Sequence, residues 1–362
     1  MTVKPVVSFS DFKQTSKALL LGVAFLVTLP FLSMDKAQAR YDFGEKECIP
    51  IHMSFLQPWG DEYFPNLRLW RSEFLSHQRL GVDEVVLQWT MWGADLNKEI
   101  TLPVWVEAAI MGADQAGAKI WFGLRYDPSL IENLKNKGQP YLDARLHETK
   151  QIATALKSQM SYAANPSEVF AGWYISDEID AALLQDNKLR KLLTQYMLET
   201  QAILNRILPG PVSISGYTNS THEPKKLARL WDTLLDNTLV DVLLLQDGLG
   251  AKLMEPYSSR KLQRAISAQF KQHGHTVIPV VEIFEIDPRK PDFRTMPTTV
   301  GTMKRRLDNA RFDPNQPVAL FSLSSHILKY DNKHSRDIEE FLSKNAKTCG
   351  RSIFRTAVTA TQ

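Results

Sequence analysis

Apolar residues in this chain follow two patterns, which alternate from about residue 49 onward. Short continuous apolar runs predict buried strands, and apolar residues that recur every three or four positions predict amphipathic helices. Eight runs of the first kind occur, at residues 49–59, 84–92, 118–127, 169–178, 211–217, 240–248, 276–285 and 317–326. No linker rich in Gly, Ser or Pro separates them. We therefore expect one domain.

Helical patterns fill the intervals between these runs. The clearest is an apolar stripe from Leu189 to Ile207, which ends at Pro209-Gly210. Strands that are apolar on both faces and separated by crossover helices form a parallel sheet covered by helices. Eight such units predict an α/β fold, a single (β/α)8 TIM barrel over residues 40–348 with a C-terminal tail at 349–362. The alternative is an open doubly wound sheet, but its Gly-x-Gly-x-x-Gly signature does not follow the first strand.

The first 39 residues have the order of a secretory signal peptide. Basic residues at Lys4, Lys13 and Lys17 precede an apolar run at 18–34, and the small-x-small triplet Ala37-Gln38-Ala39 follows. We expect cleavage after Ala39, no stable membrane insertion afterwards, and a periplasmic or extracellular protein. An uncleaved membrane anchor is the alternative, since the apolar run is almost long enough to span a bilayer.

Net charge gives no reason to expect nucleic acid as a partner. Loss of residues 1–39 removes four lysines and two aspartates, so the formal charge falls from +3 to +1. No Cys/His cluster has the spacing of a zinc site, and we expect no metal or other cofactor. The sequence does not determine the number of copies in the native protein, and we assume a monomer.

The two cysteines, Cys48 and Cys349, lie near the two ends of the predicted barrel. In an oxidising compartment they are a candidate pair, although two isolated buried thiols are the simpler alternative. The first strand begins at the bottom of a barrel, the last helix returns to the bottom, and closure makes the first and last units neighbours. This geometry predicts a disulfide between Cys48 and Cys349.

A TIM barrel carries its active site at the C-terminal ends of its strands. In this chain those ends are rich in aromatic, amide and charged residues. Aromatic faces pack against the apolar face of a sugar ring, and polar groups bind its hydroxyls. The candidate substrate ligands are Gln57, Trp59, Gln88, Trp92, Arg125, Tyr126, Asp177, Tyr217, Gln246, Asp247 and Glu285.

Two further acids suit glycosidic bond cleavage, which needs one carboxyl group to protonate the leaving oxygen and another to attack the sugar or activate water. The fourth and seventh strands end in Glu178 and Glu282. Neighbouring strand residues face opposite ways, so only one of Asp177 and Glu178 enters the mouth of the barrel. Asp177 is then expected to hold a neighbouring Arg or Tyr, and its charge is expected to raise the pKa of Glu178. Asp180 is expected to be the N-cap or a first-turn acid of the helix that follows.

Several pieces of the chain carry a resemblance to known proteins, namely "FLQPW", "VVLQWTMWG", "GWYISDEID", "LLLQDGLG" and "VVEIFE", spread between Gln57 and Glu285. The chain resembles secreted bacterial glycoside-hydrolase-like barrels of a domain family of unknown function. More distantly, it resembles retaining (β/α)8 glycosidases with catalytic glutamates after strands four and seven. The resemblance implies Glu178 as acid/base and Glu282 as nucleophile. Many of the retaining enzymes have Asn where this chain has Asp177.

The sequence therefore predicts a secreted glycoside hydrolase that cleaves a bacterial polysaccharide or oligosaccharide. The alternative is a non-catalytic polysaccharide-binding subunit of an exopolysaccharide production system, which keeps the sugar cleft without turnover. Neither the sugar nor the linkage follows from the sequence.

Overall fold

The computed structural model describes residues 48–350, except 60–65, 94–99, 219–222, 237, 239 and 290–293. The predicted signal peptide, its cleavage site after Ala39 and the tail beyond residue 350 lie outside the described residues and stay predictions. Of the helices in the described part, none is both long and apolar enough to cross a bilayer.

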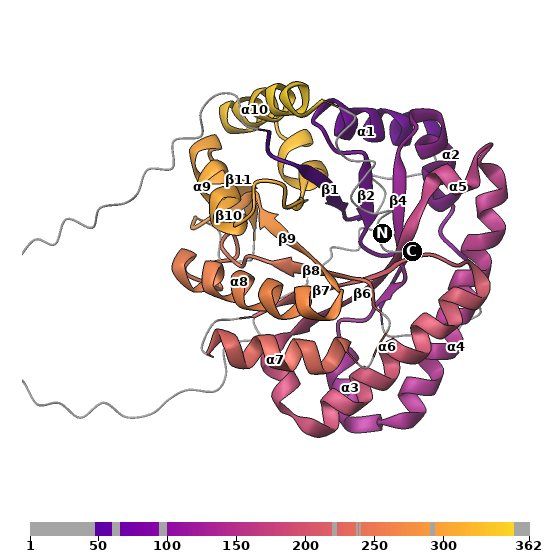
Figure 1. Ribbon diagram of the computed structural model, residues 1–362. Helices are drawn as coiled ribbons and strands as arrows, with labels where there is room; N and C mark the ends of the chain where they lie inside the picture. Colours follow the sequence, from indigo (N-terminus) through magenta and orange to yellow (C-terminus); the bar gives the residue numbers. More distant parts are fainter. Residues whose placement is uncertain are drawn as a thin grey trace, which may run out of the picture.

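Eight parallel strands close into a barrel, as the hydrophobic pattern predicts (Figure 1). The strand that ends the sheet pairs with the first one, so the barrel has no open edge. In order around the barrel, the strands are β1 (Ile51–Leu56), β2 (Glu84–Leu87), β4 (Lys119–Gly123), β6 (Phe170–Asp180), β7 (Val212–Tyr217), β8 (Val242–Gln246), β9 (Thr276–Glu282) and β12 (Val318–Phe321).

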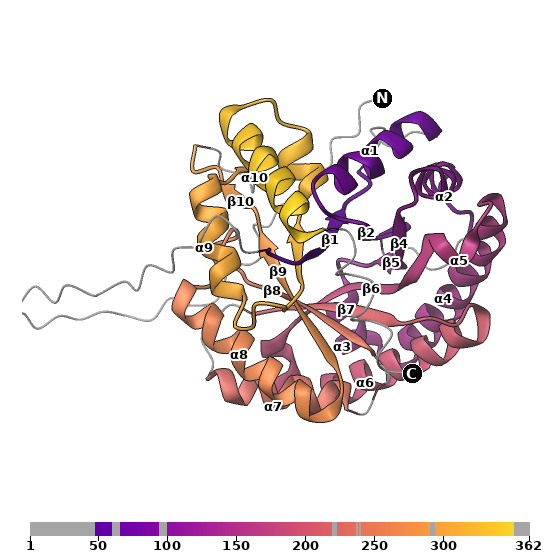
Figure 2. The same ribbon diagram turned by 45° about the horizontal axis from the view of Figure 1, so that its top comes forward.

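Helices surround the barrel, as both ribbon views show (Figure 1 and Figure 2). They are α1 (Leu67–Arg79), α2 (Trp105–Ala116), α3 (Leu130–Lys137), α4 (Gln139–Gln159), α5 (Pro166–Val169), α6 (Asn187–Ile207), α7 (Pro224–Leu235), α8 (Pro256–His273), α9 (Val300–Ala310) and α10 (Lys333–Cys349). The N-cap of α6 is not the predicted residue, Asp180. Strand β6 continues through Asp180, and Asp186 caps α6 by accepting from the N–H groups of Lys188 and Leu189.

Apolar side chains fill two layers, one inside the barrel and one between the barrel and the helices. Met53, Phe55, Val86 and Leu244 belong to the inner layer. The outer layer includes Trp70, Trp105 and Trp231, which lie on helices. Because side chains alternate along a strand, residues two positions beyond the inner layer project into the mouth at the C-terminal end.

Two short strand pairs extend the structure beyond the barrel. Strand β3 (Met91–Trp92) pairs in parallel with β5 (Arg125–Tyr126), and β10 (Phe284–Ile286) pairs antiparallel with β11 (Thr295–Pro297). Each pair includes a strand that follows a barrel strand within a few residues. They therefore fix the backbone of segments that carry several of the predicted ligands.

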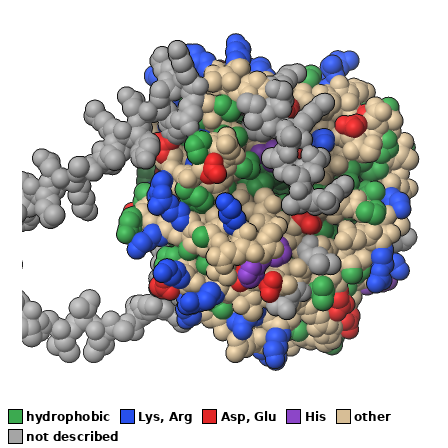
Figure 3. Space-filling view, in the orientation of Figure 1, with side chains coloured by type: hydrophobic (Ala, Val, Ile, Leu, Met, Phe, Trp, Pro, Cys, Tyr) green, Lys and Arg blue, Asp and Glu red, His purple; other side chains and the backbone are tan. Residues whose placement is uncertain are grey.

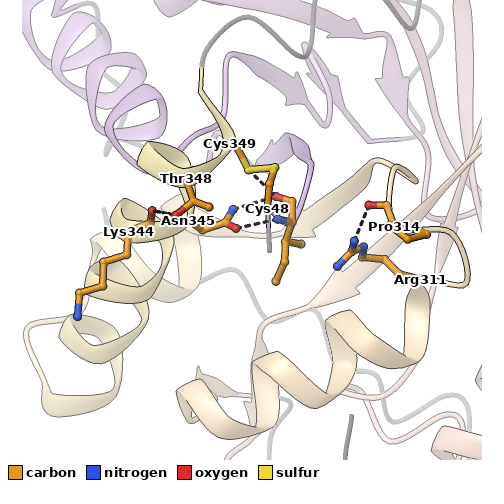
Figure 4. Close-up of a disulfide and its surroundings, with 8 residues drawn as sticks. Cys48, Arg311, Pro314, Lys344, Asn345, Thr348 and Cys349 are labelled. Atoms are coloured by element: carbon orange, nitrogen blue, oxygen red, sulfur yellow. Dashed lines mark hydrogen bonds between the residues drawn. A yellow bond between two sulfur atoms is a disulfide. The ribbon is translucent and has the colours of Figure 1, made fainter. Parts of the chain in front are cut away.

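The predicted disulfide is confirmed: Cys48 and Cys349 are bonded, with Cα atoms 4.7 Å apart (Figure 4). Asn345, one turn earlier on α10, supports the same junction. Its amide oxygen accepts from the N–H of Ile49 and its amide nitrogen donates to the carbonyl of Ile49, each at 2.8 Å. The end of the last helix is thereby joined to the start of the first strand.

Loss of this disulfide is expected to lower the free energy of unfolding by about 4 to 5 kcal/mol, because the bond closes a loop of 301 residues in the unfolded chain. Urea unfolding of the Cys349→Ser variant beside the oxidised wild type measures the difference. Asn345→Ala is the control, since it loses two hydrogen bonds and keeps the covalent link. Equal midpoints for oxidised and reduced wild type would contradict the prediction.

Charged side chains are dispersed on the surface. Figure 3 shows Lys and Arg side chains spread around one face, with Asp and Glu side chains among them and hydrophobic side chains between. The presence of both signs of charge on this face agrees with the small formal net charge of the chain, +3.

Candidate active site

Glu178 lies near the C-terminal end of β6 and is held by two amide side chains from other strands. Gln88, which follows β2, donates to its Oε1 atom at 3.0 Å, and Gln246, which ends β8, donates to the same atom at 2.9 Å. An oxygen that already accepts two N–H groups is the poorer position for a proton. The neutral carboxyl group therefore carries its proton on Oε2.

Burial raises the pKa of Glu178 to about 7, and the negative charge of Glu282 contributes to the increase. The hydrogen bond from Gln246 acts in the opposite direction, because it stabilises the carboxylate. The expected contribution of Asp177 is not among the causes, so that prediction was wrong. A carboxyl group that titrates near neutral pH can serve as a general acid.

Asp177 faces away from the mouth, in keeping with strand alternation. It is 2% exposed, and its Oδ2 atom accepts from Arg145 at 2.7 Å and from the hydroxyl of Tyr196 at 2.9 Å. Arg125 is also buried and donates to Glu148 and to the carbonyls of Trp92 and Gly93. The contacts of Asp177 agree with the expectation that it holds a neighbouring Arg or Tyr, and they leave its carboxylate with protein partners in place of a substrate. Arg125 was expected to be a substrate ligand, and the structure instead pairs it with Glu148, a helix residue that lies behind the strand.

Glu282 ends β9 and is 3% exposed. Its Oε2 atom accepts from the N–H of Ala251 at 2.8 Å. Burial raises the pKa of this carboxyl group, while the N–H groups of Ala251 and Gly250 and the charge of Arg306 oppose part of the increase. A Cβ at Gly250 would come within 2.9 Å of the Glu282 Cβ, so glycine at this position allows the loop after β8 to reach the carboxylate.

Two other acids near Glu282 have supporting contacts. Asp247 is fully buried, its Oδ1 atom accepts from the N–H of Leu249 at 3.1 Å, and burial together with Glu282 raises its pKa well above the usual range. Glu285, in β10, accepts from Arg306 at 2.6 Å and from Thr298 at 3.0 Å. Among the described residues, no three His, Cys, Asp or Glu side chains are grouped as a metal site would require.

Four aromatic rings gather at the ends of β1, β2 and β4, and we call this set of Trp59, Trp89, Trp92 and Tyr126 the aromatic group. The three indole rings have centroids 4.7 Å apart, and Trp92 stacks on Tyr126 at 4.6 Å. Trp59 also donates to Gln57 at 3.2 Å. Trp92 is 38% exposed, so part of its indole ring is open to the solvent. An exposed indole can stack on a sugar ring.

The aromatic group adjoins the acid. The charge of Glu178 raises the pKa of Tyr126 in addition to the effect of burial, and it does the same for Tyr217 at the end of β7. Both phenols therefore remain protonated at neutral pH and can donate hydrogen bonds. The structure thus brings Glu178, Glu282 and most of the predicted amide and aromatic ligands to one end of the barrel.

The buried charged residues that were not predicted from the sequence include Arg145 and Glu148 on α4 and Arg306 on α9. A charged residue in an amphipathic helix is usually interpreted as solvent-facing. The only local signal was the i, i+3 spacing of Arg145 and Glu148, which allows opposite charges to pair on one helix.

Removal of the exposed indole is expected to weaken sugar binding. In a Trp92→Ala variant we expect about a tenfold loss in oligosaccharide affinity, equal to roughly 1.4 kcal/mol, because the stacking face disappears. Isothermal titration calorimetry measures the change. Tyr162→Ala is the matched control, since Tyr162 is an exposed aromatic residue at the far end of α4. Equal losses in both variants would contradict a binding role for Trp92.

The fold is a (β/α)8 barrel with acidic, amide and aromatic side chains gathered at the C-terminal ends of its strands. The chain matches the model of a domain of unknown function, DUF4434, over residues 51–329, and it belongs to that family. The "Uncharacterized protein YbcH" of Escherichia coli K12 is 31% identical over 198 residues, or 54% of this chain. The match spans 64% of that protein, less than two thirds of its length.

Solved structures with this fold include glycosidases. A Bacteroides thetaiotaomicron protein provisionally named an alpha-L-fucosidase has a TM-score of 0.65 at 16% identity, covering 88% of this chain and all of that one. The GH99 endo-alpha-mannosidase of the same species has a TM-score of 0.47 at 12% identity, covering 82% and 95% of the two chains. At 16% identity, the likeness to the first of these structures shows the fold alone.

Proposed function

We propose that this protein is an exported glycoside hydrolase that cleaves a bacterial polysaccharide or oligosaccharide. One observation carries the proposal: two carboxyl groups with raised pKa values, Glu178 near the end of β6 and Glu282 at the end of β9, interact electrostatically at one end of the barrel, and the aromatic group adjoins Glu178. The adjoining exposed indole and amide side chains favour a carbohydrate site.

In the proposed mechanism, Glu178 acts first as general acid. Its neutral form donates the Oε2 proton to the glycosidic oxygen as the bond to the leaving sugar breaks. Glu282 attacks the anomeric carbon and forms a covalent glycosyl-enzyme. Glu178, now a carboxylate, removes a proton from water, and the resulting nucleophile releases the sugar and restores both side chains. The amides of Gln88 and Gln246 hold the acid. In this mechanism Tyr217 binds a sugar hydroxyl.

The negative charge of Glu282 supports this division of roles. Because two charges at one mouth repel each other, ionised Glu282 favours the neutral form of Glu178. Formation of the glycosyl-enzyme would remove that charge, lower the pKa of Glu178 and prepare it to act as a base in the second step.

The test is hydrolysis of a panel of bacterial glycans by the wild-type protein and by Glu178→Gln. Release of reducing ends by the wild type alone supports the hydrolase. A wild type that binds a glycan without cleaving it would refute the hydrolase and support the polysaccharide-binding subunit. Absence of both binding and cleavage across the panel would refute both.

A further inference from the structure

A buried chain of alternating charges connects the strand that carries Glu178 to helix α4. Asp177, the neighbour of Glu178, accepts from Arg145 Nη2 at 2.7 Å. The other terminal nitrogen of Arg145 donates to Glu148 Oε2 at 3.2 Å. The hydroxyl of Tyr196, on α6, donates to the same oxygen of Asp177 at 2.9 Å. The backbone next to Glu178 is thereby attached to two helices.

From Glu148 the chain continues to the aromatic group. Glu148 Oε1 accepts from Arg125 Nε at 2.5 Å, and Arg125 Nη1 donates to the carbonyl oxygens of Trp92 at 3.2 Å and Gly93 at 3.1 Å. Arg125 therefore binds the backbone of the very residue whose ring is exposed at the mouth. We call the set Arg125, Glu148, Arg145 and Asp177 the charge chain.

Stability alone is a poor explanation for the charge chain. All four residues are at most 4% exposed. Moving charges out of water costs several kcal/mol each, and buried ion pairs are often no more stabilising than apolar residues of similar volume. What such a set does provide is fixed geometry, because each guanidinium fork can donate to its partners in only a few orientations.

We propose that the charge chain is a positioning device, which sets the separation between the Glu178 carboxyl group and the face of Trp92. A sugar stacked on Trp92 would thus present its glycosidic oxygen to the acid. The inference rests on the proposed function, and it assigns Arg125, Glu148, Arg145 and Asp177 as positioning residues. A misplacement of about 1 Å in such a site can cost about 100-fold in rate.

The main test is a double-mutant cycle between Glu148→Gln and Trp92→Ala. Glu148→Gln keeps the side-chain volume and removes the charge between the two arginines. We expect kcat to fall about 10- to 100-fold with little change in KM. In the Trp92→Ala background the same change should cost less than a third as much, because there is no longer a ring to align. Equal costs in both backgrounds would overturn the proposal.

A matched control lies at the opposite end of the barrel. Glu84, at the start of β2, pairs with His52 at 3.4 Å and accepts from Trp121 at 2.7 Å. Glu84→Gln should lower stability with an unchanged kcat, and its effects should add to those of Trp92→Ala. If Glu148→Gln does not fold, Tyr196→Phe replaces it in the double-mutant cycle with Trp92→Ala, because this change removes one donor to Asp177.

A crystal structure of the Glu148→Gln or Tyr196→Phe variant separates this inference from the proposed function, because it needs no turnover. We expect the Trp92 ring to shift relative to Glu178 while Gln88 and Gln246 keep their bonds to Glu178. If the wild type proves inactive and the ring shifts, the proposed function fails and the positioning role stands. If the wild type is active and the ring stays in place, the positioning role fails alone.

Discussion

Replacement of Glu282 by alanine is expected to abolish turnover, with a loss of about 10⁴-fold or more in kcat, because no glycosyl-enzyme can then form. The variant also removes the acceptor of the Ala251 N–H group, so its folding is measured beside its activity. A small anion such as azide should restore turnover in this variant and yield a glycosyl azide of inverted configuration.

Stereochemistry provides the second part of this test. The wild type should release the retained anomer, and the carboxyl groups of Glu178 and Glu282 should lie about 5 to 5.5 Å apart, whereas about 6.5 to 9.5 Å would indicate inversion. Proton NMR of the first product distinguishes the anomers. Glu84→Gln is the matched control, since Glu84 lies at the start of β2, away from the strand ends that carry the acids. Wild-type activity in Glu282→Ala would make Asp247 or Glu285 the candidate nucleophile.

Replacement of Glu178 by alanine should lower kcat on natural glycans by about 10² to 10⁴-fold, because their leaving groups need a proton. Aryl glycosides with activated leaving groups should lose far less in the bond-breaking step. In the wild type, the acid form of Glu178 is active, so activity should decline as pH rises through about 7. This decline is the alkaline limb of the pH–activity profile, and it should be absent in Glu178→Ala.

A second substitution checks the sign of that pH dependence. The hydrogen bond from Gln246 lowers the pKa of Glu178, so Gln246→Leu should move the alkaline limb to higher pH. Measured kcat/KM profiles with an activated and an unactivated substrate provide both comparisons. An alkaline limb that persists unchanged in Glu178→Ala would assign the titration to another group.

The sequence by itself determined the barrel, because strand and helix periods are local properties of the chain. It also determined which residues lie at the strand ends, since strand order and direction follow from the repeated strand–helix unit. The Cys48–Cys349 bond followed from the same reasoning, because closure makes the first strand and the last helix neighbours whatever their separation in sequence.

Only the tertiary structure decided which strand-end residues face the mouth and what sets their charge. Asp177 and Arg125 point toward α4, where Arg145 and Glu148 carry the opposite charges. The spacing of these residues along the chain does not show that they form these two ion pairs. The pKa of Glu178 depends on burial and on Glu282, which lies on another strand, rather than on adjacent Asp177. Electrostatic interactions depend on distance and solvent exposure, which are properties of the folded molecule and not of spacing along the chain.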